Sequence, residues 1–256
     1  MSVDTQKVIE IVKQVKPLFL DREGSSYIKV KGVADFVTQI DFKVQEQVKT
    51  ALYELYPKIQ FMGEEKDNSD IDFEGDVWIL DPVDGTTNLI HDFRNSTLSL
   101  ALARKGVLTL GIIYHPYSDE VFVAERGKGA WLNGNPISVS KRENFSECLV
   151  SIGTSPYYRE LAKENFKIFE KVFMDCADIR RLGSAALELA YVAAGRIDAY
   201  FERSLKPWDY AAGTLLVKEA GGKVTDYKGN SVDITGNSDI VAGNEMIGEI
   251  LVERYL

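Results

Sequence analysis

Two aspartates stand close together at the end of an apolar run in the segment WILDPVDGTTN, residues 78–88. Asp81 follows Trp-Ile-Leu, and Asp84 comes three positions later, behind Pro82 and Val83. Asp-Pro and Asp-Gly pairs are common in turns, so one interpretation is simply a strand that leaves the core. The alternative is that the proline stiffens the turn, so that both carboxylates and the Val83 carbonyl converge on one or two metal ions. This second interpretation requires further ligands elsewhere in the chain.

Further acids occur where other apolar segments end or begin. Glu64 and Glu65 follow Phe-Met-Gly, and Asp209 follows Pro-Trp at the predicted start of a helix. Taken singly, each acid is explained by a turn or by a helix N-cap. Together with the first pair they supply the carboxylate oxygens that magnesium prefers, alongside waters and substrate phosphate. We therefore interpret the set as a magnesium site.

The residues directly behind Asp84 favour an anion. Gly85 leaves room for backbone amides to approach a phosphate, and Thr86 and Thr87 open the next segment with unpaired N–H groups. A metal cluster beside a phosphate cradle is typical of phosphoryl transfer. Two histidines and two cysteines offer little material for a histidine or cysteine nucleophile, and metal-assisted attack by water requires none.

In the first half, the elements that must position these residues are helices followed by strands. Apolar residues recur at helical spacing in 8–15 and again in 44–55. FMGEE (61–65) and DVWIL (76–80) are typical of short buried strands, and the second delivers Asp81. From 96 to 123 the pattern predicts an antiparallel meander, and Asn133-Gly134 predicts a tight turn with positive φ.

The second half alternates strands and helices. Strands are expected near 149–152, 197–201 and 240–242, with helices at 160–172, at 184–194 ending before Gly195, at 209–220 and at the C-terminus. The fold class is thus α+β followed by α/β. Because no linker or composition break separates the halves, we expect a single unit (1–256) with an N-terminal α+β subdomain (1–145) and a C-terminal α/β subdomain (146–256).

Composition narrows the class of protein. Among 256 residues, 39 are acidic and 30 basic, so the formal net charge is −9, and general attraction to nucleic acid or an anionic membrane is not expected. Cys148 and Cys176 are too few for a disulfide framework and are expected to be buried or neutral thiols in a reducing compartment. No secretory signal and no apolar run of roughly 20 residues is present. We expect a soluble cytoplasmic protein.

Three blocks in order carry a resemblance to a known family: GEE (63–65), WILDPVDGTTN (78–88) and WDYAAGTLLVKEAGG (208–222). With ADFVTQID (34–41), GKGAWLNG (127–134) and the segment 180–202, they make the chain closely similar to the inositol monophosphatase family, in its bacterial form. Members are lithium-sensitive, magnesium-dependent phosphatases. The resemblance implies a layered αβαβα sandwich of the inositol monophosphatase/fructose-1,6-bisphosphatase type, and a homodimer.

The resemblance also implies a metal-ligand set. Glu64, Asp81 and the Val83 carbonyl would hold a first Mg²⁺, and Asp81, Asp84 and Asp209 a second. Glu64 would also touch a third, weaker ion, and Li⁺ is expected to inhibit. The family pattern usually has an aromatic residue after the Asn of DGTTN, where this chain has Leu89. We expect this departure to change packing and not metal binding.

The remaining site residues follow from the same resemblance. Thr86, hydrogen-bonded to Asp41, would orient and deprotonate the attacking water on the metal held by Glu64. The amides of Gly85 and Thr86 would hold the phosphate. The pocket for the alcohol part of the substrate would be lined by Asp84, Gly183, Ser184, Ala185 and Glu202.

The expected function is Mg²⁺-dependent hydrolysis of a small phosphate monoester without a covalent intermediate, with myo-inositol 1-phosphate as the first candidate. The same motifs occur in relatives that hydrolyse fructose 1,6-bisphosphate, the 2′-phosphate of NADP, or 3′-phosphoadenosine 5′-phosphate. Glu202 favours a polyol because a carboxylate accepts hydrogen bonds from hydroxyls. A regulatory binding protein is the alternative from a different class, and the intact set of predicted ligands argues for the enzyme.

Overall fold

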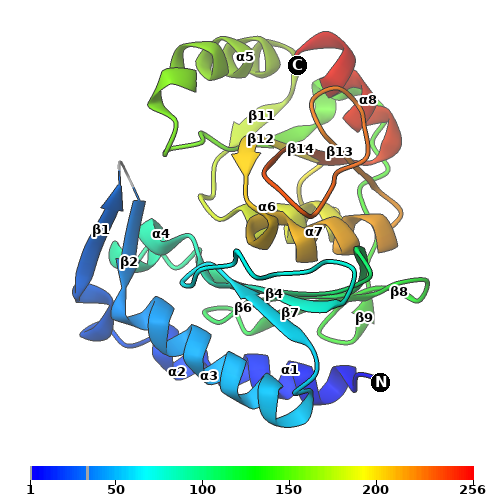
Figure 1. The fold of residues 1–256 in the computed structure, drawn as a ribbon. Helices are drawn as coiled ribbons and strands as arrows, with labels where there is room; N and C mark the ends of the chain where they lie inside the picture. The colour runs from blue at the N-terminus through cyan, green and yellow to red at the C-terminus, as the bar shows by residue number, and fades with distance from the viewer. Residues whose placement is uncertain (1, 33–34) are drawn as a thin grey trace.

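The computed structural model describes residues 2–32 and 35–256, and these form five stacked layers (Figure 1). From one side to the other the layers are helices, a seven-stranded sheet, two central helices, a five-stranded sheet and a last pair of helices. Three clusters of buried apolar side chains fill the spaces between the layers. This is the expected αβαβα sandwich.

The first layer contains α1 (Thr5–Lys13), α2 (Lys16–Phe19) and α3 (Gln39–Leu55). Asp4 caps α1 by accepting hydrogen bonds from the backbone amides of residues 6 and 7. Thr38 caps α3, and Asp41 completes a capping box with it. The predicted apolar stripes of α1 and α3 face the seven-stranded sheet, so the prediction of these two helices is confirmed.

The seven-stranded sheet has the order β3-β4-β5-β6-β7-β8-β9. Its strands are β3 (Gln60–Gly63), β4 (Asp76–Asp84), β5 (Thr97–Arg104), β6 (Val107–His115), β7 (Glu120–Glu125), β8 (Gly129–Leu132) and β9 (Asn135–Pro136). Strands β3 and β4 are parallel and every later neighbour is antiparallel, as expected for the meander. Asn133 and Gly134 both have positive φ, at 49° and 79°, as predicted.

The central layer consists of α6 (Ala185–Ala193) and α7 (Pro207–Glu219). Both helices are rich in small buried residues, which lets them lie close to the sheet. A Cβ at Gly111 of β6 would lie 2.7 Å from the carbonyl oxygen of Ala212, so only glycine fits there. Ser184 caps α6, and Gly195 follows its end with φ 67°.

The second sheet has the order β11-β10-β12-β14-β13. Its strands are β10 (Leu149–Ile152), β11 (Asp178–Arg180), β12 (Ala199–Leu205), β13 (Lys223–Thr225) and β14 (Ser238–Gly243). The outer face is covered by α5 (Ala162–Asp175) and α8 (Glu245–Arg254). Short 3₁₀ turns at Gly24–Ser26, Phe145–Glu147 and Arg159–Leu161 complete the secondary structure.

The structure differs from the sequence-based expectation in several elements; β11 and β13 were not predicted, and three further differences lie near the predicted acids or at the N-terminal hairpin. The strand predicted for 61–65 ends at Gly63, so Glu64 and Glu65 lie in the following turn. The strand predicted for 76–80 continues to Asp84, because β4 keeps its pairing with β5 on both sides of a bulge. The hairpin of β1 (Ile28–Gly32) and β2 (Asp35–Thr38) was not expected, and Ala34 of the quoted block lies outside the described residues.

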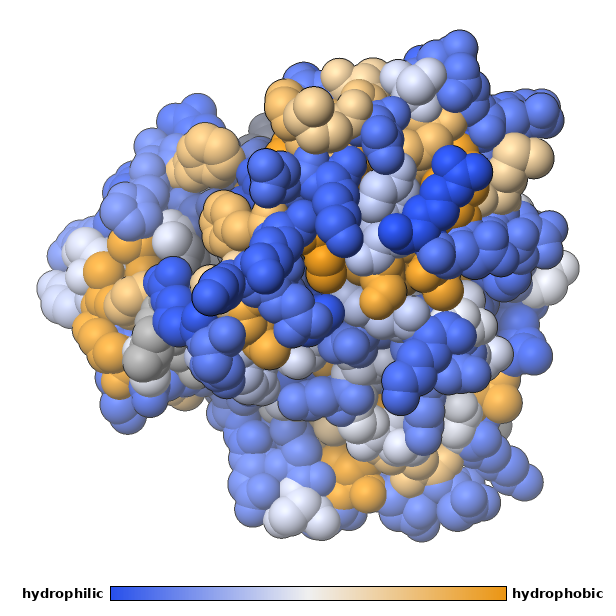
Figure 2. Space-filling view, turned by 90° about the horizontal axis from the view of Figure 1, so that it is seen from above, coloured by the Kyte–Doolittle hydropathy of each residue, from blue (hydrophilic) through white to orange (hydrophobic). Residues whose placement is uncertain are grey.

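Hydrophilic residues cover most of the face seen from above, with apolar groups scattered among them (Figure 2). Exposed apolar side chains on α5 are Phe166, Phe173 and Met174. Within the described part of the chain, no helix is both long and apolar enough to cross a membrane. The two thiols, Cys148 and Cys176, are free, and burial raises the pKa of each.

Candidate active site

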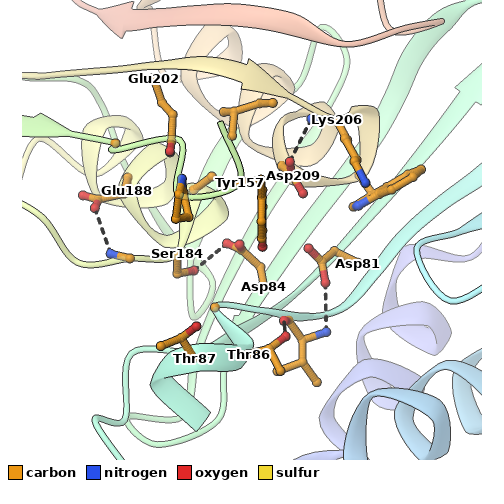
Figure 3. A pocket seen from close by; sticks show the side chains of 18 of the residues that line it. Asp81, Asp84, Thr86, Thr87, Tyr157, Ser184, Glu188, Glu202, Lys206 and Asp209 are labelled. Carbon is orange, nitrogen blue, oxygen red and sulfur yellow. Dashed lines mark hydrogen bonds between the residues drawn. The ribbon is translucent and has the colours of Figure 1, made fainter. Parts of the chain in front are cut away.

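One pocket collects the predicted site residues. It lies where the end of β4, the short helix α4 (Thr86–Ile90), the loop before α6, the start of α7 and strand β12 meet (Figure 3). Its lining includes Glu64, Asp81, Val83, Asp84, Gly85, Thr86, Gly183, Ser184, Ala185, Glu202 and Asp209. Asp41 is the one predicted residue that does not line it and reaches it through Thr86.

The turn at the end of β4 is held by its own polar groups. Asp81 accepts a hydrogen bond from the Val83 amide at 2.9 Å, inside the bulge that separates Asp81 from Asp84. Gly85 then takes φ 88°, and a Cβ there would lie 2.9 Å from the Gly183 carbonyl oxygen. Glycine is therefore required by backbone conformation and by close approach of the loop before α6.

Thr86 connects the pocket to the first helical layer. Its hydroxyl lies 3.0 Å from a carboxylate oxygen of Asp41 and 3.1 Å from the Val83 carbonyl oxygen. Asp41 is fully buried in α3 and accepts hydrogen bonds from the amide and hydroxyl of Thr38 through its other oxygen. Burial raises the pKa of Asp41, while the bonds from Thr38 and Thr86 lower it. The pair has the contact that the sequence predicted.

The acids of the pocket repel one another. Burial raises the pKa of Asp81 well above its usual range, and the charges of Glu64, Asp84 and Asp209 raise it further. Burial likewise raises the pKa of Glu64 to about 7 and that of Asp84 to about 6. A cation bound among these carboxylates would reduce their mutual repulsion, because it favours their ionised form.

This donor set fits magnesium. All of its side-chain donors are carboxylate oxygens, and Val83 lines the same pocket. Among residues 2–32 and 35–256, no three acidic, histidine or cysteine side chains converge closely enough to surround an ion by themselves. Magnesium usually retains several waters and needs only one or two carboxylates for each ion, so a gathered but open set is suitable. Lys31 of β1 lies 3.6 Å from Glu64 and pairs with Glu65.

Asp84 joins the two halves of the molecule. One of its oxygens accepts hydrogen bonds from the Ser184 hydroxyl at 2.5 Å and from the Ala186 amide at 2.6 Å, at the first turn of α6. Asp209 is positioned in a similar way, because it accepts the Lys206 amide at 2.8 Å at the start of α7. Figure 3 shows Asp81 and Asp84 of β4 and Asp209 of α7 facing the same space.

Glu202 lies on the side of the pocket formed by the second sheet. It accepts hydrogen bonds from the Ser155 amide at 2.8 Å and from the Tyr200 hydroxyl at 2.6 Å. Burial raises its pKa, and these two bonds and the charge of Arg181 lower it. Its carboxylate is thus held in place by the protein at the edge of the pocket.

Sequence reasoning missed several lining residues, among them Phe36, Tyr157, Glu188 and Lys206, and left the role of Arg181 open. Glu188 carried a readable signal, because it is the one charged residue in the buried helix AALELAYVA. The others lie in loops or at element ends whose placement depends on the whole fold. Leu89, the departure from the family pattern, is fully buried against the first helical layer.

Known proteins are similar to this chain in sequence and in fold. Residues 2–255 match the inositol monophosphatase family. An inositol-1-monophosphatase of Rhizobium meliloti is 40% identical over 226 residues, which cover 88% of this chain and 85% of the relative. Nus factor SuhB of Escherichia coli K12 is 40% identical over 218 residues, covering 85% of this chain and 81% of the relative. A crystal structure of the extragenic suppressor protein suhB of Bartonella henselae has a TM-score of 0.90 at 34% identity, with 98% of this chain and 99% of that chain covered.

The match extends over nearly the whole chain, and the acids singled out from the sequence line one pocket. The chain is a phosphatase that belongs to the inositol monophosphatase family.

Proposed function

We propose that this protein hydrolyses a small phosphate monoester with Mg²⁺, and that myo-inositol 1-phosphate is its first candidate substrate. The proposal rests on one observation above all: the acids of three separate sequence blocks line one pocket beside Gly85 and Thr86. The name of the Rhizobium relative supports the choice of inositol phosphate. Fructose 1,6-bisphosphate, NADP and 3′-phosphoadenosine 5′-phosphate remain the alternatives.

For the metals we propose the ligand set inferred from the resemblance. Glu64, Asp81 and the Val83 carbonyl would hold one Mg²⁺, Asp81, Asp84 and Asp209 a second, and Glu64 a third, weaker ion. When bound, the ions would supply positive charge to the phosphate and lower the pKa of a bound water. Inhibition by Li⁺ at saturating Mg²⁺ is part of the proposal.

For catalysis we propose that Thr86 and Asp41 act as a pair, next to Glu64. The Thr86 hydroxyl donates to buried Asp41, so its oxygen remains available to accept a hydrogen bond from the attacking water. Asp41 can accept the proton that passes through this contact because burial raises its pKa. We propose that water attacks the phosphate directly, without a covalent intermediate, as the family resemblance implies.

For the substrate we propose that the amides of Gly85 and Thr86 hold the phosphate. The alcohol part would contact Asp84, Gly183, Ser184, Ala185 and Glu202. The Glu202 carboxylate is already held by Ser155 and Tyr200, so it can offer remaining lone pairs to substrate hydroxyls without reorganising.

The test is phosphate release with Mg²⁺ from a matched panel: myo-inositol 1-phosphate, fructose 1,6-bisphosphate, NADP and 3′-phosphoadenosine 5′-phosphate. Asp84→Asn serves as the inactive control. One substrate that leads in kcat/KM, with a dead control, supports the proposal and identifies the substrate. Equal slow release by wild type and control from all four substrates would contradict it.

We further propose a homodimer in the cytoplasm, with residues 1–145 and 146–256 as subdomains of one unit. Sedimentation velocity tests the dimer directly. The name of the Escherichia coli relative, a Nus factor, supports a second role in binding other macromolecules. We propose that role in addition to catalysis and not as a replacement for it, because every predicted metal ligand is present in this chain.

A further inference from the structure

Glu188 is a buried acid that the proposed chemistry does not use. It lies in α6 and lines the pocket, yet only 2% of its surface is exposed. Side chains in a helix lean toward the N-terminus, so this carboxylate returns to the loop that precedes α6. Burial raises the pKa of Glu188 to about 7, and the charge of Glu202 raises it further. Because burial of a carboxylate is energetically unfavourable, the position of Glu188 beside the pocket needs a local explanation.

Its contacts provide one. One oxygen of Glu188 accepts the Leu182 amide at 2.6 Å and the Gly183 amide at 3.4 Å. The other oxygen accepts the Ser151 hydroxyl, whose own oxygen lies 3.2 Å from the carbonyl oxygen of Arg180. Glu188 therefore holds the loop before α6 by accepting hydrogen bonds from the N–H groups of that loop (Figure 3).

The carbonyl groups of the same loop are bound from the opposite side. The Asn88 side chain in α4 donates toward the Leu182 carbonyl at 2.8 Å and the Gly183 carbonyl at 3.3 Å. The next residue, Ser184, donates to Asp84 at 2.5 Å. The segment 182–184 is thus fixed between Glu188 in the second half of the chain and the turn that contains Asp84 and Asn88 in the first half.

Residue 183, at the centre of the segment, has no room for a side chain that could take over the role of these hydrogen bonds. Gly183 has φ 81°, and a Cβ there would lie 2.8 Å from the Arg181 guanidinium and 3.3 Å from the Asn88 amide. At Gly183 the backbone is held by the polar groups around it, whereas the neighbouring Leu182 also packs against the central apolar cluster. Removal of the strongest acceptor should therefore let the backbone at Gly183 move.

We propose that Glu188 is a positioning residue: it fixes segment 182–184 and so sets the preference of the enzyme for the alcohol part of the substrate. The inference rests on the proposed function, because this segment is where the alcohol would bind. A charged acceptor suits the role, since hydrogen bonds to a carboxylate are shorter and stronger than those to a neutral oxygen. An alternative, that Glu188 only stabilises the fold, makes different predictions.

The test compares Glu188→Ala, Glu188→Gln and a matched control, Asp198→Asn. Asp198 is also 2% exposed and accepts a backbone amide, that of Leu149 at 2.7 Å, but it is not among the residues that line the pocket. For each protein, kcat/KM is measured for myo-inositol 1-phosphate and for p-nitrophenyl phosphate, which has no hydroxyls for the alcohol pocket. Hydrogen–deuterium exchange of segment 180–186 is measured in parallel.

The quantity compared is kcat/KM for myo-inositol 1-phosphate divided by kcat/KM for p-nitrophenyl phosphate. We expect Glu188→Ala to lower this ratio by about tenfold and to speed exchange in segment 180–186. Glu188→Gln keeps one acceptor and should lower the ratio by about threefold. Asp198→Asn should leave the ratio unchanged. Because a ratio is measured, loss of folded protein cancels, and Glu188→Gln carries the comparison alone if Glu188→Ala does not fold.

Two results would overturn the proposal: an unchanged ratio in both Glu188 variants, or a change in Asp198→Asn as large as theirs. If the wild-type protein cleaved neither compound, the proposed function would fail instead. Exchange in segment 180–186 would then still decide the structural part, since unchanged exchange in Glu188→Gln and Glu188→Ala would show that Glu188 does not hold the segment.

Discussion

The two sides of the pocket, the proposed phosphate side and the proposed alcohol side, are built in different ways. The phosphate side is one short stretch, residues 81–88, in which a bulge, a glycine with positive φ and a single turn of helix follow one another along the chain. The alcohol side is assembled from a loop, a helix and a strand that lie far apart in sequence, with Gly183, Glu188 and Glu202 as members. Local geometry thus shapes the proposed phosphate cradle, whereas tertiary packing brings Glu64, Asp41 and Asp209 to it and builds the proposed alcohol side.

Asp84→Asn should have the largest effect, because Asp84 belongs to both sides. The amide weakens a proposed metal ligand, while its oxygen can still accept the hydrogen bonds from Ser184 and Ala186, which both reach one oxygen of Asp84. We expect kcat/KM to fall by about 10³-fold with the fold retained. Steady-state kinetics with circular dichroism measures both, and turnover near the wild-type value would contradict the assignment.

Thr86→Ala should affect the phosphate side alone. The variant loses the hydroxyl that lies between Asp41 and the pocket, so water is oriented poorly while the alcohol side stays intact. We expect kcat to fall by about 10²-fold with KM changed much less. Thr87→Ala, one position along the same helix turn, is the matched control. A rise in KM at constant kcat would instead place Thr86 in substrate binding.

Stability should depend on pH through the acids at the centre of the pocket. The folded protein holds protons on Glu64 and Asp84 up to pKa values of about 7 and about 6, whereas the unfolded chain has released them. The free energy of unfolding without metal should therefore fall as pH rises from about 4.5 to about 7. Mg²⁺ should reverse this trend, because it binds the ionised carboxylates.

Differential scanning fluorimetry with EDTA or with Mg²⁺ measures this dependence. We expect Tm without metal to decrease between about pH 5 and about pH 7.5, and the rise produced by Mg²⁺ to be larger at the higher pH. A Tm that increased with pH in EDTA would contradict the sign. Asp84→Asn, which removes one of the acids, should flatten the slope.

Glu202→Gln should have a smaller effect than Asp84→Asn or Thr86→Ala, confined to the alcohol side. The amide still accepts from Ser155 or Tyr200 but loses the charge that favours substrate hydroxyls. We expect the preference for myo-inositol 1-phosphate over the other panel members to change by about fivefold, with p-nitrophenyl phosphate still cleaved. Equal changes for all substrates would assign Glu202 to the fold.

The same contrast explains how much the sequence predicts. The helices at the N-terminus, the meander and the alternating second half were recognisable because their apolar periodicity is local. The β1–β2 hairpin was not recognised: Ile28 to Lys31 alternate apolar and basic residues, but the run is short and exposed along its whole length, so it packs no face on the core. The bulge in β4 resembled a turn because Asp-Pro usually marks one.

For the site, the acids around WIL and PW were recognisable from their place beside apolar segments. The roles of Asp41 and of segment 183–185 came only through the family resemblance, because nothing in their own spacing points to a pocket. Glu188 was missed because one acid in a helix is usually solvated, and only its return to the loop before α6 reveals a different role.

The bonds from Asp84 to Ser184 and Ala186 join residues 100 and 102 positions apart. Contacts with such a long sequence separation form slowly, because a large loop must close before they contribute. On the ribosome the chain emerges from its N-terminus, so Asp84 is available long before α6 or Asp209. A partly synthesised chain therefore carries the phosphate turn without its partners, and hydrolysis must await release of almost the entire polypeptide.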